Sequence, residues 1–181
     1  MSWRGRFLKL LGLKPWLYPI AYHLAYESEF LTSSELASRV GDVRTSLIRR
    51  ALWYFKKIDA LEILTGTPLK FRLKPDARKE LYDIVSEDII TVKNKVFLIG
   101  RDDIYYYIVL RRRKIIARGV KKDIIESVYD ILKRVKGGKF SIAELKAATN
   151  LAYREASLAT KVLYMLGRVE KSNDGKYFIS S

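Results

Sequence analysis

The sequence has no cysteine, a single histidine and no long uninterrupted run of apolar residues. The absence of cysteine excludes disulfides, thiolate metal sites and cysteine nucleophiles, and one histidine leaves little material for a metal centre. No stretch approaches the roughly 18 apolar residues that a membrane-spanning helix needs. Residues 1–14 are basic and apolar, but Lys9 interrupts them and no small-residue cleavage site follows. We therefore expect a cytoplasmic protein without a signal peptide and without membrane insertion.

Motifs of enzymes are also missing. The chain contains no Walker-type phosphate loop, no dinucleotide-binding glycine fingerprint and no nucleophile elbow. His23 has no nearby pair of candidate ligands, so we interpret it as a packed or half-exposed histidine. Asp102 and Asp103 lack the further carboxylates that a nuclease uses to hold magnesium. We expect no catalytic residue, no bound metal and no cofactor.

Basic residues are in large excess, with 35 lysines and arginines against 20 acidic residues and a net charge of +15. Such a field attracts a polyanion, either nucleic acid or an anionic membrane. The excess is densest in residues 91–120, which hold eight basic and two acidic side chains. Glutamine is absent, asparagine is scarce, and charged residues and isoleucine are abundant, a bias typical of proteins from hot environments. We expect a thermophilic archaeal source.

Two distant segments begin with the same local signal, a hydroxyl residue followed three positions later by glutamate. The pairs are Thr32 with Glu35 and Ser141 with Glu144. In such a capping box the hydroxyl accepts a hydrogen bond from the amide of the glutamate, and the carboxylate accepts one from the amide of the hydroxyl residue. The sequence therefore predicts that a helix begins at each position.

A second helix is predicted after a break at Gly41 in the first segment and at Asn150 in the second. Both helices carry apolar residues at positions i, i+1, i+4, i+5 and i+8, which line one face. These residues are Leu47, Ile48, Ala51, Leu52 and Phe55 in the first helix, and Leu158, Ala159, Val162, Leu163 and Leu166 in the second. On this alignment the second segment has two more residues between the box and the apolar stripe.

An amphipathic helix precedes each box, and two short strand-like runs follow each stripe. The runs are 61–65 and 69–73 in the first segment and 168–172 and 176–179 in the second, where Asn173-Asp174-Gly175 is a strong hairpin signal. This order, and above all the run Leu163–Phe178, resembles the winged helix-turn-helix family. The resemblance implies two DNA-binding units, and basic tandem winged-helix subunits of general transcription factors are similar in organisation.

We therefore predict an α+β protein with two winged helix-turn-helix units joined by a helix and a small antiparallel β-meander. The first domain, residues 1–90, comprises a basic N-terminal arm, the first unit and a bracing helix that begins at Pro75 and ends near Asp88. A basic linker, 91–120, has strands at 95–99, 104–110 and 114–118. The second unit occupies 121–181.

In winged-helix proteins the exposed face of the third helix enters the major groove of DNA. The resemblance assigns this role in the first unit to Arg44, Thr45, Ser46, Arg49, Arg50, Lys56 and Lys57. No acidic residue lies between Arg44 and Lys57, which favours phosphate or base contact over a merely solvated face. Trp53 on the same helix either packs against the hairpin or the bracing helix, or stacks on a base.

The corresponding face of the second unit is less basic. Its candidate DNA contacts are Arg154, Ser157 and Lys161, and the same face includes Glu155 and Thr160. This face is interpreted as a weaker DNA reader or a protein contact.

Two further groups of cations are candidates for phosphate contact. The hairpins carry Lys70, Arg72, Lys171 and Lys176, which either reach phosphates or limit strand-edge pairing. The sharpest cluster is the run Arg111, Arg112, Arg113 and Lys114. Four cations at one turn repel each other unless phosphates or acidic protein groups neutralise them.

The leading hypothesis is a non-enzymatic double-stranded DNA-binding protein of transcription regulation or of transcription-machinery assembly, associated with the nucleoid. One alternative is a scaffold subunit of a chromosome-maintenance or replication complex, with a protein partner on the second unit. Another is binding of RNA or single-stranded DNA through the Tyr105–Tyr107 strand, of which alternation leaves only part exposed. A homodimer is a further possibility, because many winged-helix regulators dimerise.

Overall fold

The computed structural model describes residues 1–135 and 138–180 of an α+β fold. The chain divides into two compact units, one formed by residues 1–89 with 108–117 and the other by residues 90–107 with 118–181. The segment 91–120, expected to be a linker, is thus divided between the two units. Each unit has its own apolar core.

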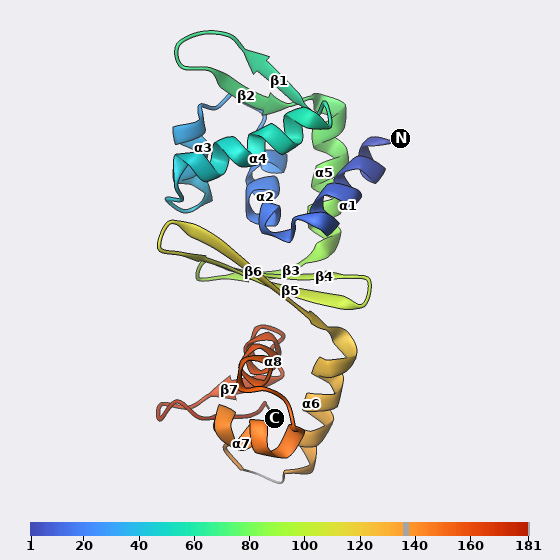
Figure 1. Ribbon diagram of the computed structural model, residues 1–181, viewed down its shortest axis with the longest axis vertical. Helices are drawn as coiled ribbons and strands as arrows, with labels where there is room; N and C mark the ends of the chain where they lie inside the picture. Colours follow the sequence, from blue (N-terminus) through green and yellow to red (C-terminus); the bar gives the residue numbers. More distant parts are fainter. Residues whose placement is uncertain (136–137, 181) are drawn as a thin grey trace. The chain divides into compact units, whose positions relative to one another are not determined.

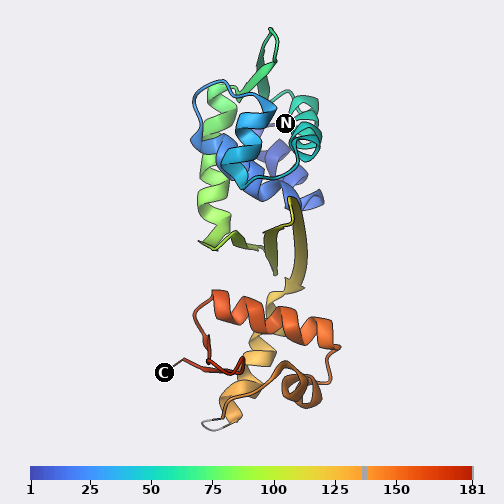
Figure 2. The same cartoon turned by 90° about the vertical axis from the view of Figure 1, so that its left-hand side faces the viewer.

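The first unit is mainly helical (Figure 1). Its elements up to the sheet are α1 (Trp3–Leu13), a 3₁₀ turn η1 (Pro15–Leu17), α2 (Tyr18–Tyr26), α3 (Ser33–Val40), α4 (Thr45–Lys57), β1 (Leu61–Leu64), β2 (Lys70–Leu73) and α5 (Pro75–Asp88). Helix α5 begins at the predicted proline and packs on α1 and α2, as expected of a bracing helix. The β1–β2 hairpin projects beyond the helices of its unit (Figure 2).

The N-terminal residues are folded and differ from the expected basic arm. Residues 3–13 form α1, and the hydroxyl of Ser2 caps it by accepting a hydrogen bond from the amide of Gly5 at 3.1 Å. Phe7, Leu10 and Leu11 have the i, i+3, i+4 spacing of one helical face and are buried. Burial of this face against α5 makes the segment part of the core.

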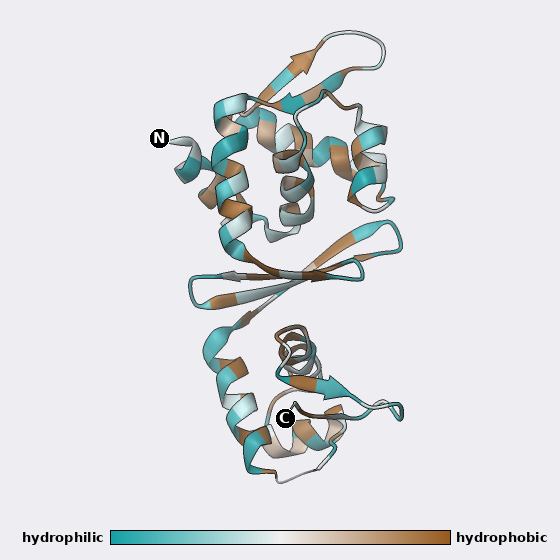
Figure 3. Ribbon diagram, turned by 180° about the vertical axis from the view of Figure 1, so that it is seen from behind, coloured by the Kyte–Doolittle hydropathy of each residue, from teal (hydrophilic) through white to brown (hydrophobic). Residues whose placement is uncertain are grey.

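Four strands form a meander, hydrogen-bonded in chain order: β3 (Ile89–Lys93), β4 (Val96–Arg101), β5 (Ile104–Arg111) and β6 (Lys114–Lys121). Three of them were predicted from the sequence, and β3 was not. Two-residue turns connect them, and both turn residues have positive φ at Asn94-Lys95 and at Arg112-Arg113. Hydrophobic residues occupy the middle of the strands and hydrophilic residues the turns (Figure 3).

The second unit continues with α6 (Lys122–Arg134), α7 (Ile142–Thr149), α8 (Tyr153–Met165), β7 (Val169–Lys171) and β8 (Tyr177–Ile179). Its core gathers Leu98 of β4 with Ile125, Val128 and Leu132 of α6 and with apolar residues of α7, α8 and the hairpin. Both units therefore have three helices followed by an antiparallel hairpin, in the order α2-α3-α4-β1-β2 and α6-α7-α8-β7-β8.

The two units share a further detail that the sequence did not reveal. The residue directly before each helix cap pairs with the second strand of the hairpin, Leu31 with Phe71 and Phe140 with Tyr177. Each pair exchanges two backbone hydrogen bonds of 2.7–2.9 Å. The entry to the second helix of each unit thus adds a one-residue third strand to the hairpin.

The caps are closely similar but not identical. Thr32 and Glu35 form the complete capping box that was predicted. Ser141 accepts from the amide of Glu144 at 3.1 Å, but the Glu144 carboxylate is bonded to the Ser141 hydroxyl instead of the Ser141 amide. The breaks after these helices have positive φ at Gly41 and Asn150, which allows the sharp turn.

The alignment of the two third helices predicted from apolar spacing is wrong by three residues. Helices α4 and α8 both have 13 residues, and Ile48, Ala51, Leu52 and Phe55 are buried at the same positions as Ala156, Ala159, Thr160 and Leu163. The connection before the helix is one residue shorter in the second unit (150–152) than in the first (41–44). The apolar pattern missed this register because a polar residue, Thr160, occupies one of the core positions. Its buried hydroxyl is satisfied by donating to the carbonyl oxygen of Ala156 at 2.8 Å.

Candidate nucleic-acid interface

Helix α4 buries one face and exposes a basic one. Ile48, Ala51, Leu52 and Phe55 lie in the core of the first unit. The exposed residues at its cap and along its outer face are Arg44, Ser46, Arg49, Arg50, Trp53, Lys56 and Lys57, and Thr45 is half-buried. The helix thus holds all seven predicted contact residues along its solvent side or at its first turn.

These cations have no ion-pair partner in the part of the chain that the structure describes. Among residues 1–135 and 138–180, no carboxylate forms an ion pair with Arg44, Arg49, Arg50, Lys56 or Lys57. The Lys57 ammonium lies 5.0 Å from the ring centroid of Trp53, which itself contacts Tyr54 and is 54% exposed. Trp53 therefore presents its ring on the same basic face. Packing against the hairpin or α5, one of the two predicted roles of this residue, does not bury it.

The β5–β6 turn brings a second basic cluster to the start of α4 (Figure 1). The carbonyl oxygen of Arg113 accepts a hydrogen bond from the amide of Arg44 at 3.1 Å. Arg111, Arg112, Arg113 and Lys114 are all exposed, and within the described chain none of them is ion-paired. Two groups of candidate residues that are far apart in the sequence therefore form one surface.

A groove lies between the turn and the helix. Its volume is about 360 Å³, and its walls are Arg44, Ser46, Leu47, Arg50, Arg113, Lys114 and Ile115. The lining contains four cations and no carboxylate, so its electrostatic potential favours an anion. Local sequence patterns do not predict that these two clusters meet, because their contact depends on the packing of the β5–β6 hairpin against the α3–α4 turn.

The predicted phosphate contacts on the β1–β2 hairpin have different environments. Arg72 pairs with Glu62 at 2.7 Å, donates to the carbonyl oxygen of Ser28 and lies over the ring of Phe30. These contacts tie Arg72 to its own hairpin and to the loop before α3. Lys70 is half-buried, and no carboxylate among the described residues pairs with it.

Helix α8 of the second unit carries fewer cations than α4. Arg154 and Lys161 are exposed on α8 and Ser157 is half-buried, but Thr160, expected on the same face, is buried. By position in the helix, Ser157 takes the place of Arg49 and Leu158 that of Arg50. Helix α8 therefore lacks the pair of arginines that α4 carries.

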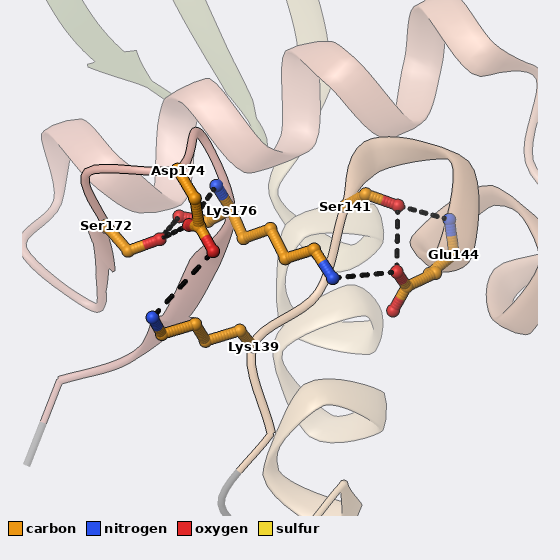
Figure 4. Close-up of polar contacts among 6 residues, drawn as sticks. All are labelled: Lys139, Ser141, Glu144, Ser172, Asp174 and Lys176. Carbon is orange, nitrogen blue, oxygen red and sulfur yellow. Dashed lines mark hydrogen bonds and ion pairs between the residues drawn. The ribbon is translucent and has the colours of Figure 1, made fainter.

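Acidic residues also neutralise part of the second hairpin (Figure 4). Lys176 lies 3.7 Å from the carboxylate of Glu144, and Lys139 lies 3.9 Å from that of Asp174. The Asp174 carboxylate also accepts hydrogen bonds from the hydroxyl of Ser172 and the amide of Lys176, and these bonds lower the pKa of Asp174. Of the two predicted lysines on this hairpin, only Lys171 has no such partner within the described residues.

The Tyr105–Tyr107 segment of β5 packs in part on the core of the second unit. Tyr105 and Tyr107 are partly buried against that core, and the Lys122 ammonium lies 5.2 Å from the Tyr105 ring centroid. Burial raises the pKa of the Tyr107 hydroxyl. The ring of Tyr106 lies close to Gly119, where a Cβ would approach it to 3.2 Å. All three rings are only partly accessible for stacking on bases.

The candidate catalytic groups remain dispersed. His23 is half-buried with its ring edge against Tyr22, and burial, followed by the charge of Arg39, lowers its pKa. Within the described residues no group of three histidine, cysteine, aspartate or glutamate side chains is arranged to hold a metal ion. No helix in residues 1–135 or 138–180 combines the length and apolarity required to cross a bilayer.

Comparison with known proteins gives no relative from which a function transfers. The sequence matches no protein-family model and no curated protein.

Proposed function

We propose that this chain is a non-enzymatic double-stranded DNA-binding protein with two winged helix-turn-helix units. It acts in transcription regulation or in assembly of the transcription machinery, in association with the nucleoid. Helix α4 enters the major groove, the cations of the β5–β6 turn contact the backbone, and the second unit gives weaker DNA contact or binds a protein partner.

The main support for this proposal is the basic surface of α4 and the adjoining β5–β6 turn. Nine cations, from Arg44 to Lys57 and from Arg111 to Lys114, lie on these two elements without an ion pair among the described residues. Exposed helix faces usually carry both acidic and basic residues. On a surface with charges of one sign these charges repel each other, and binding of a polyanion relieves the repulsion.

The repeated topology supports the winged-helix part of the proposal. Three helices, a hairpin and a bridge from the residue before the second helix to the hairpin recur in both units. In a winged helix this order presents the third helix to the major groove and the hairpin to the flanking backbone. The 13-residue length of both third helices fits this placement.

The test is a binding titration with duplex DNA at two salt concentrations, with single-stranded DNA and RNA of the same sequence in parallel. The variant Arg49→Ala with Lys56→Ala removes two cations of α4, and Arg154→Ala with Lys161→Ala removes two cations of α8 as a charge-matched control. We expect salt-sensitive binding that is tightest for the duplex and a larger loss for the α4 variant. Equal losses would mean that net charge alone determines binding, and absence of salt-sensitive duplex binding would overturn the proposal.

One observation favours the scaffold alternative for the second unit. A largely apolar groove of about 170 Å³ on this unit is lined by α6, the last residue of α7 and the loop that follows it, including Ile124, Val128, Ile131 and Leu151. Tyr153, at the start of α8, is 55% exposed. A stable partner that is retained after nuclease treatment and lost on Ile124→Asp would support this alternative.

A further inference from the structure

The groove between α4 and the β5–β6 turn has walls from two independent elements. Arg44 and Arg50 belong to the start of α4, and Arg113 and Lys114 belong to the turn and the first residue of β6. The hydrogen bond from the Arg44 amide to the Arg113 carbonyl oxygen fixes the turn to the helix. The side chains therefore converge on one space while their backbones remain joined beside it.

The docking of the turn is built into the first unit. Gly41 has φ +139°, and a Cβ at this position would lie 3.0 Å from Cδ1 of Leu110 in β5. Leu110 is buried, and Ile108 two residues earlier is fully buried. The close approach of β5 to the α3–α4 turn thus leaves little room for a side chain at position 41.

The turn itself carries residues that its backbone does not favour. Arg112 and Arg113 have φ of +52° and +62°, the conformation of a type I′ hairpin turn, for which asparagine and glycine are preferred. A bulky side chain with positive φ is unfavourable, and such conformations concentrate at functional sites. Two arginines at these positions therefore indicate a use for their charge that outweighs the local cost.

We propose that this groove binds a single phosphate group, held between α4 and the β5–β6 turn. The inference rests on the proposed function for one source of that group, a backbone phosphate of DNA; the other source is a free phosphate ion. In the DNA complex the groove fixes α4 at one register along the backbone, since phosphate contacts position a protein without reading sequence. The turn is then a second backbone contact in addition to the β1–β2 hairpin.

The test uses the full-length variant Arg112→Asn with Arg113→Gly. It removes a cation from the groove and one beside it, keeps the carbonyl oxygen that bonds Arg44, and installs the residues that the turn conformation prefers. A loss of binding therefore does not come from unfolding, which a thermal melt verifies. The control for turn conformation is Lys95→Gly. It removes one cation from the β3–β4 turn, where Lys95 also has positive φ, and this turn lies outside the groove.

Two readouts are measured. Inorganic phosphate, exchanged for chloride at constant ionic strength, should raise the melting temperature of the wild type and of Lys95→Gly but not of the groove variant. For duplex DNA, the slope of log affinity against log salt should fall by at least about 0.9 in the groove variant, the value for each lost phosphate contact. It should stay unchanged in Lys95→Gly. A lower slope without any effect of inorganic phosphate would assign the groove to backbone phosphate.

The outcomes separate this inference from the proposed function. Duplex binding with the same salt slope in the groove variant and no effect of inorganic phosphate would overturn the groove and leave the proposed function standing. A phosphate-dependent melting temperature in a protein that binds no duplex would support the groove and overturn the proposed function. Absence of both would overturn both.

Discussion

Gly41 and Leu110, which are far apart in the sequence, lie side by side in the first unit. A Cβ built on Gly41 would lie 3.0 Å from Cδ1 of Leu110, and the φ of Gly41, +139°, is one that L-amino acids rarely adopt. The β5 strand thus lies against the turn between α3 and α4. It thereby places the arginines of the β5–β6 turn beside the start of α4.

Gly41→Ala should destabilise the first unit for both reasons. The backbone conformation and the clash with Leu110 together should lower the free energy of unfolding by about 2 kcal/mol, within the range for strained backbone. Urea denaturation followed by circular dichroism measures this change. Gly175→Ala is the control, because Gly175 also has positive φ but has no atom within 4 Å of the added Cβ; it should cost about 1 kcal/mol. A Gly41→Ala protein as stable as the wild type would contradict the close packing.

Thr32→Ala should remove the cap of α3. The Thr32 hydroxyl accepts from the amide of Glu35 at 3.1 Å, and Glu35 accepts from the amide of Thr32, so truncation breaks one half of the box and leaves an amide without its acceptor. The expected loss is about 1 kcal/mol in the free energy of unfolding. Thr32→Asp retains an acceptor and should stay near the wild type in the same urea titration. Equal losses for both substitutions would exclude capping as the cause.

Thr160 should tolerate loss of its hydroxyl but not of its volume. Its hydroxyl bonds only within its own helix, to the Ala156 carbonyl, while its methyl group fills the core of the second unit. Thr160→Val keeps the shape and should change the free energy of unfolding by less than about 0.5 kcal/mol. Thr160→Ala leaves a cavity and should cost about 1 kcal/mol. A larger loss for valine than for alanine in urea denaturation would show that the hydroxyl matters more than packing.

Thr160 also illustrates what sequence patterns can and cannot predict. The helices from α2 to α8, both hairpins and both cap positions followed from local signals, because capping and amphipathic periodicity act within a few residues. The equivalence of α4 and α8 did not follow, since a polar residue whose hydroxyl is bonded inside the helix can occupy a core position. Apolar spacing then matched Leu158 with Leu47, three residues away from the structural register.

Long-range contacts account for the remaining differences. The sequence marked Arg44–Lys57 and Arg111–Lys114 as separate basic clusters, which meet in the structure where β5 packs on the α3–α4 turn and the amide of Arg44 bonds the carbonyl oxygen of Arg113. The ion pair and ring contact of Arg72 likewise depend on Phe30 and Glu62 lying beside the β2 strand. Local periodicity carries no information on such pairings between distant segments.

Stability should fall as the pH is lowered through the ordinary range of histidine, because of His23. Burial, and secondarily the charge of Arg39, lowers the pKa of His23 below its usual value of 6.5. Between the two pKa values the unfolded chain binds a proton that the folded chain does not, so the free energy of unfolding decreases as the pH falls from about 6.5 to the pKa of the folded state, and His23 adds no further change below it. Urea midpoints at pH 7.5 and 5.5 measure the effect, and His23 is the only histidine in the chain.

His23→Gln, which does not titrate, should lose much less stability between the same two pH values. Arg39→Gln should reduce the loss in part by raising the pKa of His23 in the folded state. A wild type and a His23→Gln variant with the same pH dependence would assign the effect to other groups.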